Sequence, residues 1–140
     1  MDRDERIWLG VLVVVFLIFN IVTLSTLVPW QEWLLWTDHE LDQQISIGIE
    51  DYEFQFPPDG IEVQVGEYVE FIATSKDVTY GFGVFRTDGT MVFQMQVVPG
   101  YDNKIVWKFD DPGAYDVRST EYSGPRHSEM FVEDAIHVSP

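Results

Sequence analysis

The segment 119–130, STEYSGPRHSEM, carries four side chains with metal-binding or nucleophilic atoms at short spacing. Ser119, Ser123, His127 and Met130 follow one another at intervals of four, four and three residues. Imidazole and thioether groups bind soft metals such as copper, and cysteines at the two serine positions would complete such a site. The chain contains no cysteine, so neither a disulfide nor a thiolate ligand can form. The segment therefore has the spacing of a copper loop but lacks its thiolates.

The same residues can also be written as a hydrolytic triad. Ser119 or Ser123 would be the nucleophile, with His127 and a carboxylate beside it. Nucleophilic serines of hydrolases lie on a strand–turn–helix elbow next to an oxyanion hole, and neither pattern surrounds these serines. The carboxylate pairs at 110–111 and 133–134 are typical of solvated turns and strand edges. We therefore expect no catalytic residue in this chain.

After residue 44, apolar residues alternate with polar ones, which is the period of a strand with one buried face. In ISIGIEDYEFQF, Ile45, Ile47 and Ile49 share one face, and no later stretch carries a helical stripe. The further predicted strands are IEVQV, YVEFIAT, MVFQMQV, NKIVWKF, AYDVR and FVEDAIHV. Turn residues separate them at 57–60, 87–89, 98–100 and 111–113. The pattern predicts a mainly β domain, a sandwich or barrel of seven or eight strands over about 95 residues, with the segment 119–130 between its last two strands.

An uncharged run of 22 residues, 7–28, precedes this domain. At about 1.5 Å per residue, it is long enough to cross a hydrocarbon core of about 30 Å as one transmembrane helix. A cleaved signal peptide is the competing interpretation, but its apolar region is normally about 7–15 residues and ends at small residues. Here the run is longer and continues into PWQEW. Arg3 and Arg6 precede it and the next basic residue is Lys76, so the positive-inside rule predicts a cytoplasmic N-terminus and an outer C-terminal domain.

Side chains in and after the predicted helix indicate its surroundings. The amide of Asn20 would either pack against another membrane helix or be satisfied locally. Trp30, Trp33 and Trp36 follow the apolar run as an interfacial aromatic belt would. We therefore divide the chain into a cytoplasmic tip, anchor and belt at 1–36, a linker at 37–44, and an extracytoplasmic domain at 45–140.

The net charge of the chain is −16, from 24 acidic and 8 basic residues. A chain with this charge does not bind nucleic acid through a basic face. Three interpretations of the acidity stay open: attraction of a basic partner, adaptation to high salt, or a plain solvated surface. The low number of lysines, three, fits high salt.

At the loop, the chain resembles subunit II of the haem–copper oxidases, specifically the type with one membrane helix. The family's dinuclear copper motif is C-x3-C-x3-H-x2-M, with a further histidine upstream in a stretch like D-V-I-H-G-F. This chain has PGAYDVRSTEYSGPRHSEMF and DVTYGF there, and the likeness covers roughly residues 54 to 138. The positions that correspond to the copper site are Tyr80, Ser119, Glu121, Ser123, His127 and Met130.

The resemblance implies a cupredoxin-like β-sandwich, but it does not imply that this chain binds the family's copper. Three ligand positions have changed type, at Tyr80, Ser119 and Ser123, and the Glu121 position supplies only a backbone carbonyl in the family. A dinuclear centre needs both bridging thiolates, and a serine hydroxyl is too weakly acidic to replace one at neutral pH. We expect no metal and no other cofactor in this chain.

The remaining site residues then have structural roles. We expect the six copper-site positions to be joined by hydrogen bonds, with hydroxyls bonded to Glu121 or His127. Met130 is expected to fill the core, and His127 to be a hydrogen-bonded loop histidine. Phe54 matches an aromatic position near the family's electron path, and we expect it to serve in packing. The alternative is a free-standing, membrane-anchored module that binds mononuclear copper through His127 and Met130.

In the family, the copper centre passes electrons from cytochrome c to haem in subunit I, and members without it oxidise quinol, some of them to reduce nitric oxide. The resemblance therefore implies a non-catalytic, copper-free subunit II that caps the outer face of a catalytic membrane subunit I. That partner would hold the haems and the active-site metal. Quinol would be the donor, and the acceptor, oxygen or nitric oxide, stays open. Docking of a basic protein donor is disfavoured, since it would find no electron acceptor in this subunit.

Overall fold

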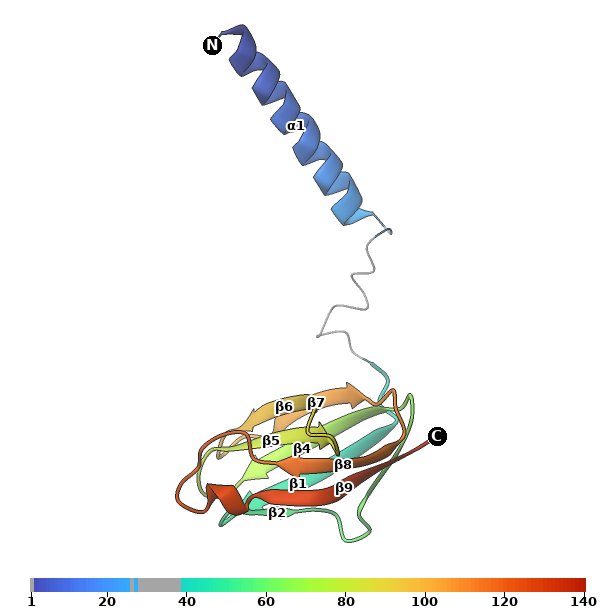
Figure 1. The fold of residues 1–140 in the computed structure, drawn as a ribbon, viewed down its shortest axis with the longest axis vertical. Coiled ribbons are helices and arrows are strands. Elements are labelled where there is room, and N and C mark those ends of the chain that lie inside the picture. Colours follow the sequence, from blue (N-terminus) through green and yellow to red (C-terminus); the bar gives the residue numbers. More distant parts are fainter. Residues whose placement is uncertain (1, 26, 28–38) are drawn as a thin grey trace. The chain divides into compact units, whose positions relative to one another are not determined.

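An apolar helix and a β-sandwich make up the described chain (Figure 1). The structure is a computed structural model, and it describes residues 2–25, 27 and 39–140. The chain divides into two units, Met1–Asp38 and His39–Pro140, which are described one at a time. The predicted aromatic belt of Trp30, Trp33 and Trp36 lies outside the described residues.

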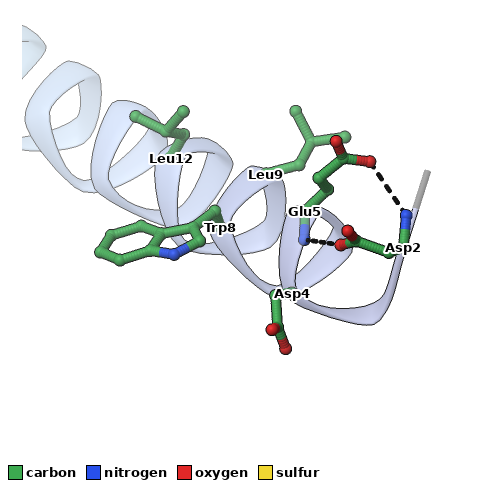
Figure 2. A pocket seen from close by; sticks show the side chains of 6 residues that line it. All are labelled: Asp2, Asp4, Glu5, Trp8, Leu9 and Leu12. Carbon is green, nitrogen blue, oxygen red and sulfur yellow. Dashed lines mark hydrogen bonds between the residues drawn. The ribbon is translucent and has the colours of Figure 1, made fainter.

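The helix α1, Arg3–Leu24, begins at a complete capping box. The amide of Glu5 donates to Asp2 Oδ1 at 2.9 Å, and the amide of Asp2 donates to Glu5 Oε2 at 2.9 Å, as Figure 2 shows. These bonds satisfy two backbone donors that a helix start otherwise leaves free. The acidic side chains Asp4 and Glu5 also lie in the first turn, where the helix dipole favours negative charge.

The helix is long and apolar enough to cross a membrane, with a mean hydropathy of 2.8 over its most apolar 18 residues. None of its residues is buried. Asn20 Nδ2 donates to the carbonyl oxygen of Phe16 at 2.8 Å, one turn earlier. One N–H of this amide is therefore satisfied within its own helix, as in the local alternative.

Two sheets form the second unit. One has the strand order β2-β1-β4-β7 and the other β3-β9-β8-β5-β6. The pairs β1–β4 and β3–β9 are parallel, and the other pairs are antiparallel. The strands are β1 Gln43–Glu50, β2 Glu53–Gln55, β3 Ile61–Gln64, β4 Tyr68–Ser75, β5 Tyr80–Arg86, β6 Met91–Val97, β7 Asn103–Lys108, β8 Gly113–Arg118 and β9 Phe131–Ser139. The mainly β prediction with one N-terminal helix is confirmed.

The strand boundaries differ from the prediction in three places. Strand β1 begins at Gln43, two residues inside the predicted linker. The run ISIGIEDYEFQF divides into β1 and β2 because Asp51 and Tyr52 adopt positive φ angles of 48° and 65°, as in a two-residue hairpin turn. Strand β5, YGFGVFR, is not among the predicted strands, because six of its seven residues are buried and the strand has no polar alternation.

The core lies between the two sheets and is rich in aromatic rings. Ile45, Ile47 and Ile49 of β1 are buried on one face, as the alternation predicted. The ring of Phe71 lies 5.8 Å from that of Phe82 and 5.4 Å from that of Phe93, measured between centroids. Burial of such rings is the dominant favourable contribution to folding, and it fixes the frame that carries the 119–130 loop.

Candidate functional site

The copper-site positions come from two parts of the sandwich. Tyr80 is the first residue of β5, and the loop 119–130 joins β8 to β9. A single 3-10 turn, η1 His127–Glu129, ends this loop and is visible in Figure 1 as the short coil before β9. Strand β8 lies between β5 and β9 in the same sheet, so the topology brings the predicted positions to one end of it.

The two serine hydroxyls close the loop on itself. Ser119 Oγ and Ser123 Oγ both donate to the carbonyl oxygen of Glu121, at 3.2 and 3.0 Å. Ser119 is buried, with 2% of its surface exposed, and its Oγ also accepts the amide of Gly81 at 3.2 Å. Its amide donates to the carbonyl oxygen of Met130 at 3.1 Å. Of the network predicted among the six positions, the bonds of the two serine hydroxyls to Glu121 are found, and Glu121 accepts them through its backbone. Tyr80 is not part of it, because its hydroxyl bonds to Asp77 and to the Tyr52 amide.

Glycines in β5 allow the loop to approach this closely. A Cβ added to Gly81 would lie 2.6 Å from the amide nitrogen of Thr120 and 2.7 Å from that of Glu121. A Cβ on Gly83 would overlap the Thr120 side chain and lie 2.9 Å from the Phe85 ring. Neither glycine is among the predicted site residues. The signal for them was YGFG itself, because glycine inside a strand often marks close approach of another backbone.

At the position of the upstream histidine, Tyr80 is fully buried and tied to an acidic turn. Its hydroxyl donates to Asp77 Oδ2 at 2.9 Å and accepts the amide of Tyr52 at 3.2 Å. Burial raises the pKa of Tyr80, and the hydrogen bond to the Asp77 carboxylate adds to the rise. The phenol therefore stays protonated at neutral pH and acts as a hydrogen-bond donor.

Asp77 is the acceptor that organises this turn. Its Oδ2 also accepts the amide of Asp51 at 2.9 Å, and its Oδ1 accepts the amide of Val78 at 2.8 Å. Burial acts to raise the pKa of Asp77, but hydrogen bonds, led by those from the Asp51 and Val78 amides, outweigh it. The net pKa lies below its ordinary value, so the carboxylate is ionised at neutral pH.

The β1–β2 hairpin holds the loop from the other side. Tyr52 Oη donates to the carbonyl oxygen of Ser123 at 3.1 Å. Gly124 has a φ of 134°, and a Cβ there would overlap Tyr52 Oη, so this position requires glycine. Arg126 Nη1 lies 3.3 Å from Asp51 Oδ1. The loop is thus bonded through Ser119, Ser123 and Arg126 to elements far away in the sequence.

The two unchanged ligand types have different environments. Met130 is buried, at 2% exposure, and belongs to the hydrophobic core, as expected. His127 lies with its ring centroid 5.7 Å from that of Tyr122. Its Nδ1 is buried and has no hydrogen-bond partner in the described part of the chain, so the hydrogen bonding expected of this loop histidine is not found at Nδ1. Phe54 packs against Phe82 at 6.2 Å between ring centroids, which is the packing role predicted for it.

The residues at these positions do not fit a dinuclear copper centre. Both serine hydroxyls are engaged by backbone groups, and the Tyr80 phenol is a protonated donor to Asp77. Only His127 and Met130 offer soft donor atoms, and neither can bridge two copper ions as a thiolate does. Within the described residues, no group of three or more His, Cys, Asp or Glu side chains is placed to hold a metal ion.

Comparison with known proteins gives relatives for the sandwich and its loop. No protein-family model matches the chain. Two curated proteins named cytochrome c oxidase subunit 2, both from Thermus thermophilus, are 33% identical to it over 88 residues, or 63% of this chain. The aligned part spans 62% of one relative and 50% of the other. The resemblance to this family is therefore confirmed as homology over these residues.

Solved structures show the same fold at lower identity. A chain of a haem–copper terminal oxidase dimer superimposes with a TM-score of 0.57 at 24% identity, covering 98% of this chain and 100% of that one. The periplasmic domain of cytochrome oxidase subunit II from Bradyrhizobium japonicum gives a TM-score of 0.57 at 19% identity, covering 74% of this chain and 88% of its own. Auracyanin B gives 0.59 at 10% identity, covering 74% of this chain and 94% of its own. The cupredoxin-like sandwich is confirmed. The membrane anchor is supported by the length and hydropathy of the helix α1.

Proposed function

We propose that this chain is a copper-free, non-catalytic subunit II of a haem–copper terminal reductase that oxidises quinol. The proposal rests on the residues found at the two positions where the family has thiolates that bridge the copper ions. Ser119 and Ser123 replace the thiolates, and both hydroxyls are bonded to the Glu121 carbonyl in place of a metal. The fold of a copper-bearing subunit is retained while its electron-accepting group cannot form.

Without an electron acceptor in this chain, electrons reach the complex by another route. A lipid-soluble quinol meets the membrane-embedded partner directly and needs no docking site on the outer domain. The partner, a catalytic subunit I, supplies the haems and the active-site metal. The sandwich covers the outer face of that subunit, and its role is to stabilise the assembly. The terminal acceptor is oxygen or nitric oxide, a choice made by the partner.

The membrane arrangement follows from the helix and its flanking charges. Residues 1–36 form the cytoplasmic tip, the anchor and the aromatic belt. The linker that follows ends before Gln43, where β1 begins, and the rest of the chain forms the domain outside the cell membrane. Arg3 and Arg6 at the start of α1 support a cytoplasmic N-terminus, because basic residues are retained on that side.

Turnover by the purified native complex tests this function. The complex should contain haem and should oxidise a quinol analogue with oxygen or nitric oxide as acceptor, both of which are assayed. It should not oxidise cytochrome c at low salt, where docking of a basic donor to an acidic domain would be strongest. Turnover with cytochrome c that depends on this subunit would contradict the proposal.

A second candidate function is favoured by the buried, unpartnered Nδ1 of His127. An unsatisfied buried nitrogen beside a buried methionine is compatible with a mononuclear copper site in a free-standing module. In that case the chain would purify without a haem-bearing partner and bind one copper ion. Loss of that copper in both His127→Ala and Met130→Leu would favour this candidate over the first.

A further inference from the structure

A pocket of about 380 Å³ lies beside the 119–130 loop, at the junction of β8 and β9. It is lined by Arg118, Ser119, His127, Ser128, Met130 and Phe131. The volume is in the range of small-ligand sites, which are mostly apolar with a few converging polar groups. Here Met130 and Phe131 provide apolar wall, and Arg118 and Ser128 provide hydrogen-bond donors.

Two aromatic rings hold Arg118 in place. Its guanidinium carbon lies 5.1 Å from the ring centroid of Phe85 and 5.3 Å from that of Phe131. The register explains this, because Arg118 on β8 is paired directly with Phe131 on β9, and Phe85 is on the other neighbouring strand, β5. Contacts with ring faces fix the plane of a guanidinium and leave the N–H groups at its edge free to donate.

The charge of Arg118 is not neutralised within the described part of the chain. In the same unit, four other cations form ion pairs with carboxylates: Lys76, Arg86, Lys104 and Arg126. The carboxylate next to the pocket in sequence, Glu129, is already bound by Arg126, with Nε and Oε2 2.9 Å apart. In a chain with 24 acidic and 8 basic residues, a guanidinium left without a carboxylate is an available anion site.

The groups around Arg118 select the type of anion. Phe131 is 41% exposed and lies beside the guanidinium, and Ser128, which also lines the pocket, is exposed. A planar fork of N–H donors matches a carboxylate, which it binds through two parallel hydrogen bonds. We propose that this pocket binds a carboxylate carried on an apolar stem, with the carboxylate on Arg118 and the stem against Phe131 and Met130. The carboxylate comes either from a small organic acid or from a side chain of the partner protein.

The first test uses the full chain in detergent and does not depend on the proposed function. Butyrate is titrated while the amide resonances of Ser128 and Phe131 are followed by NMR. These resonances should shift with saturation, whereas butanol and butylammonium, which share the stem, should leave them unchanged. Arg118→Gln should weaken butyrate binding by about tenfold or more, since it removes a charge-assisted bidentate contact. Arg118→Lys should be intermediate, because it keeps the charge and loses the fork.

Lys108→Gln is the matched control. Lys108 is a second cation outside any ion pair of the described residues, and its Nζ lies 5.5 Å from the centroid of the Tyr68 ring. Removing its charge changes the net charge by the same amount as Arg118→Gln and should leave butyrate binding as in the wild type. Resonances of strands away from the pocket report whether each variant is folded. Shifts that do not saturate, or that survive unchanged in folded Arg118→Gln, would overturn the proposal.

The second test identifies the source of the carboxylate. The Arg118→Gln and Lys108→Gln chains are purified in the native complex through increasing salt. If a partner side chain occupies the pocket, Arg118→Gln should be released at lower salt than Lys108→Gln. If the ligand is a free acid, both variants should be retained equally, and the butyrate result stands by itself.

Discussion

The burial of Ser119 leads to a prediction that distinguishes the two loop serines. In Ser119→Ala, the amide of Gly81 loses its acceptor in a buried site. An unsatisfied buried donor costs about 1–3 kcal/mol of folding free energy. In Ser123→Ala, the lost bond is exposed, so the cost should be about 0.5 kcal/mol, the lower end for a hydrogen bond. In either single variant the Glu121 carbonyl keeps one of its two hydroxyl donors.

Urea unfolding of the full chain in detergent, followed by near-UV circular dichroism, measures these differences. For a domain of about 100 residues, each kcal/mol corresponds to about 4–8 °C in Tm, so thermal unfolding gives an independent reading. Ser46→Ala, at an exposed position in β1, is the control for loss of a serine hydroxyl from the surface. The double variant Ser119→Ala/Ser123→Ala should lose more than the sum of the single variants, because the Glu121 carbonyl then loses both donors.

Amide hydrogen exchange tests the same prediction at the amide of Gly81. The amide of Gly81 should be protected in the wild type and in Ser123→Ala, and should exchange much faster in Ser119→Ala. Equal and small losses of stability in the two single variants, with Gly81 protected in both, would refute the reasoning. The hydroxyls of the two serines would then not be needed to hold the conformation of the loop.

Three further changes test the surroundings of the loop. Gly81→Ala should lower stability by about 1–3 kcal/mol or more, because its Cβ meets loop backbone, whereas Gly48→Ala meets only the end of a glutamine side chain and should cost much less in the same urea assay. The pKa of Asp77 is lowered in the folded state, so the carboxylate stabilises the fold at neutral pH, and this stabilisation is lost as the pH falls below about 4. Asp77→Asn should therefore be less stable at pH 7, and its urea midpoint should decline less steeply in acid. Tyr52→Phe removes a partly buried bond to the loop and should cost about 0.5–1.5 kcal/mol, with faster amide exchange in the loop than in the core strands.

Much of the sandwich could be predicted from the sequence because strands with one buried face alternate in polarity. The buried face of Ile45, Ile47 and Ile49 follows from that rule. Strand β5 was missed because its residues face the core or the loop on both sides and its glycines carry no pattern. A strand is recognised in a sequence by the alternation of polar and apolar residues, and a strand that is buried on both faces lacks this alternation.

In the site, too, contacts between residues close in sequence could be predicted, and contacts between distant segments could not. The bonds from Ser119 and Ser123 to Glu121 span two residues each, so the sequence could indicate them. The contacts of Tyr80 with the Tyr52 amide, and of Tyr52 with the loop, join segments 28 and 71 residues apart. Contacts of this kind depend on strand pairing, which a single sequence does not reveal.

The central claim, that the frame of a copper site is kept while copper binding is lost, is tested most directly by copper stoichiometry. The purified full chain is incubated with copper, freed of excess, and analysed for bound metal. The triple variant Tyr80→His/Ser119→Cys/Ser123→Cys is treated in parallel. The account predicts no stoichiometric copper on the wild-type chain, and two copper ions with copper–thiolate absorption on the restored variant. Stoichiometric copper on the wild type that disappears in His127→Ala would contradict it.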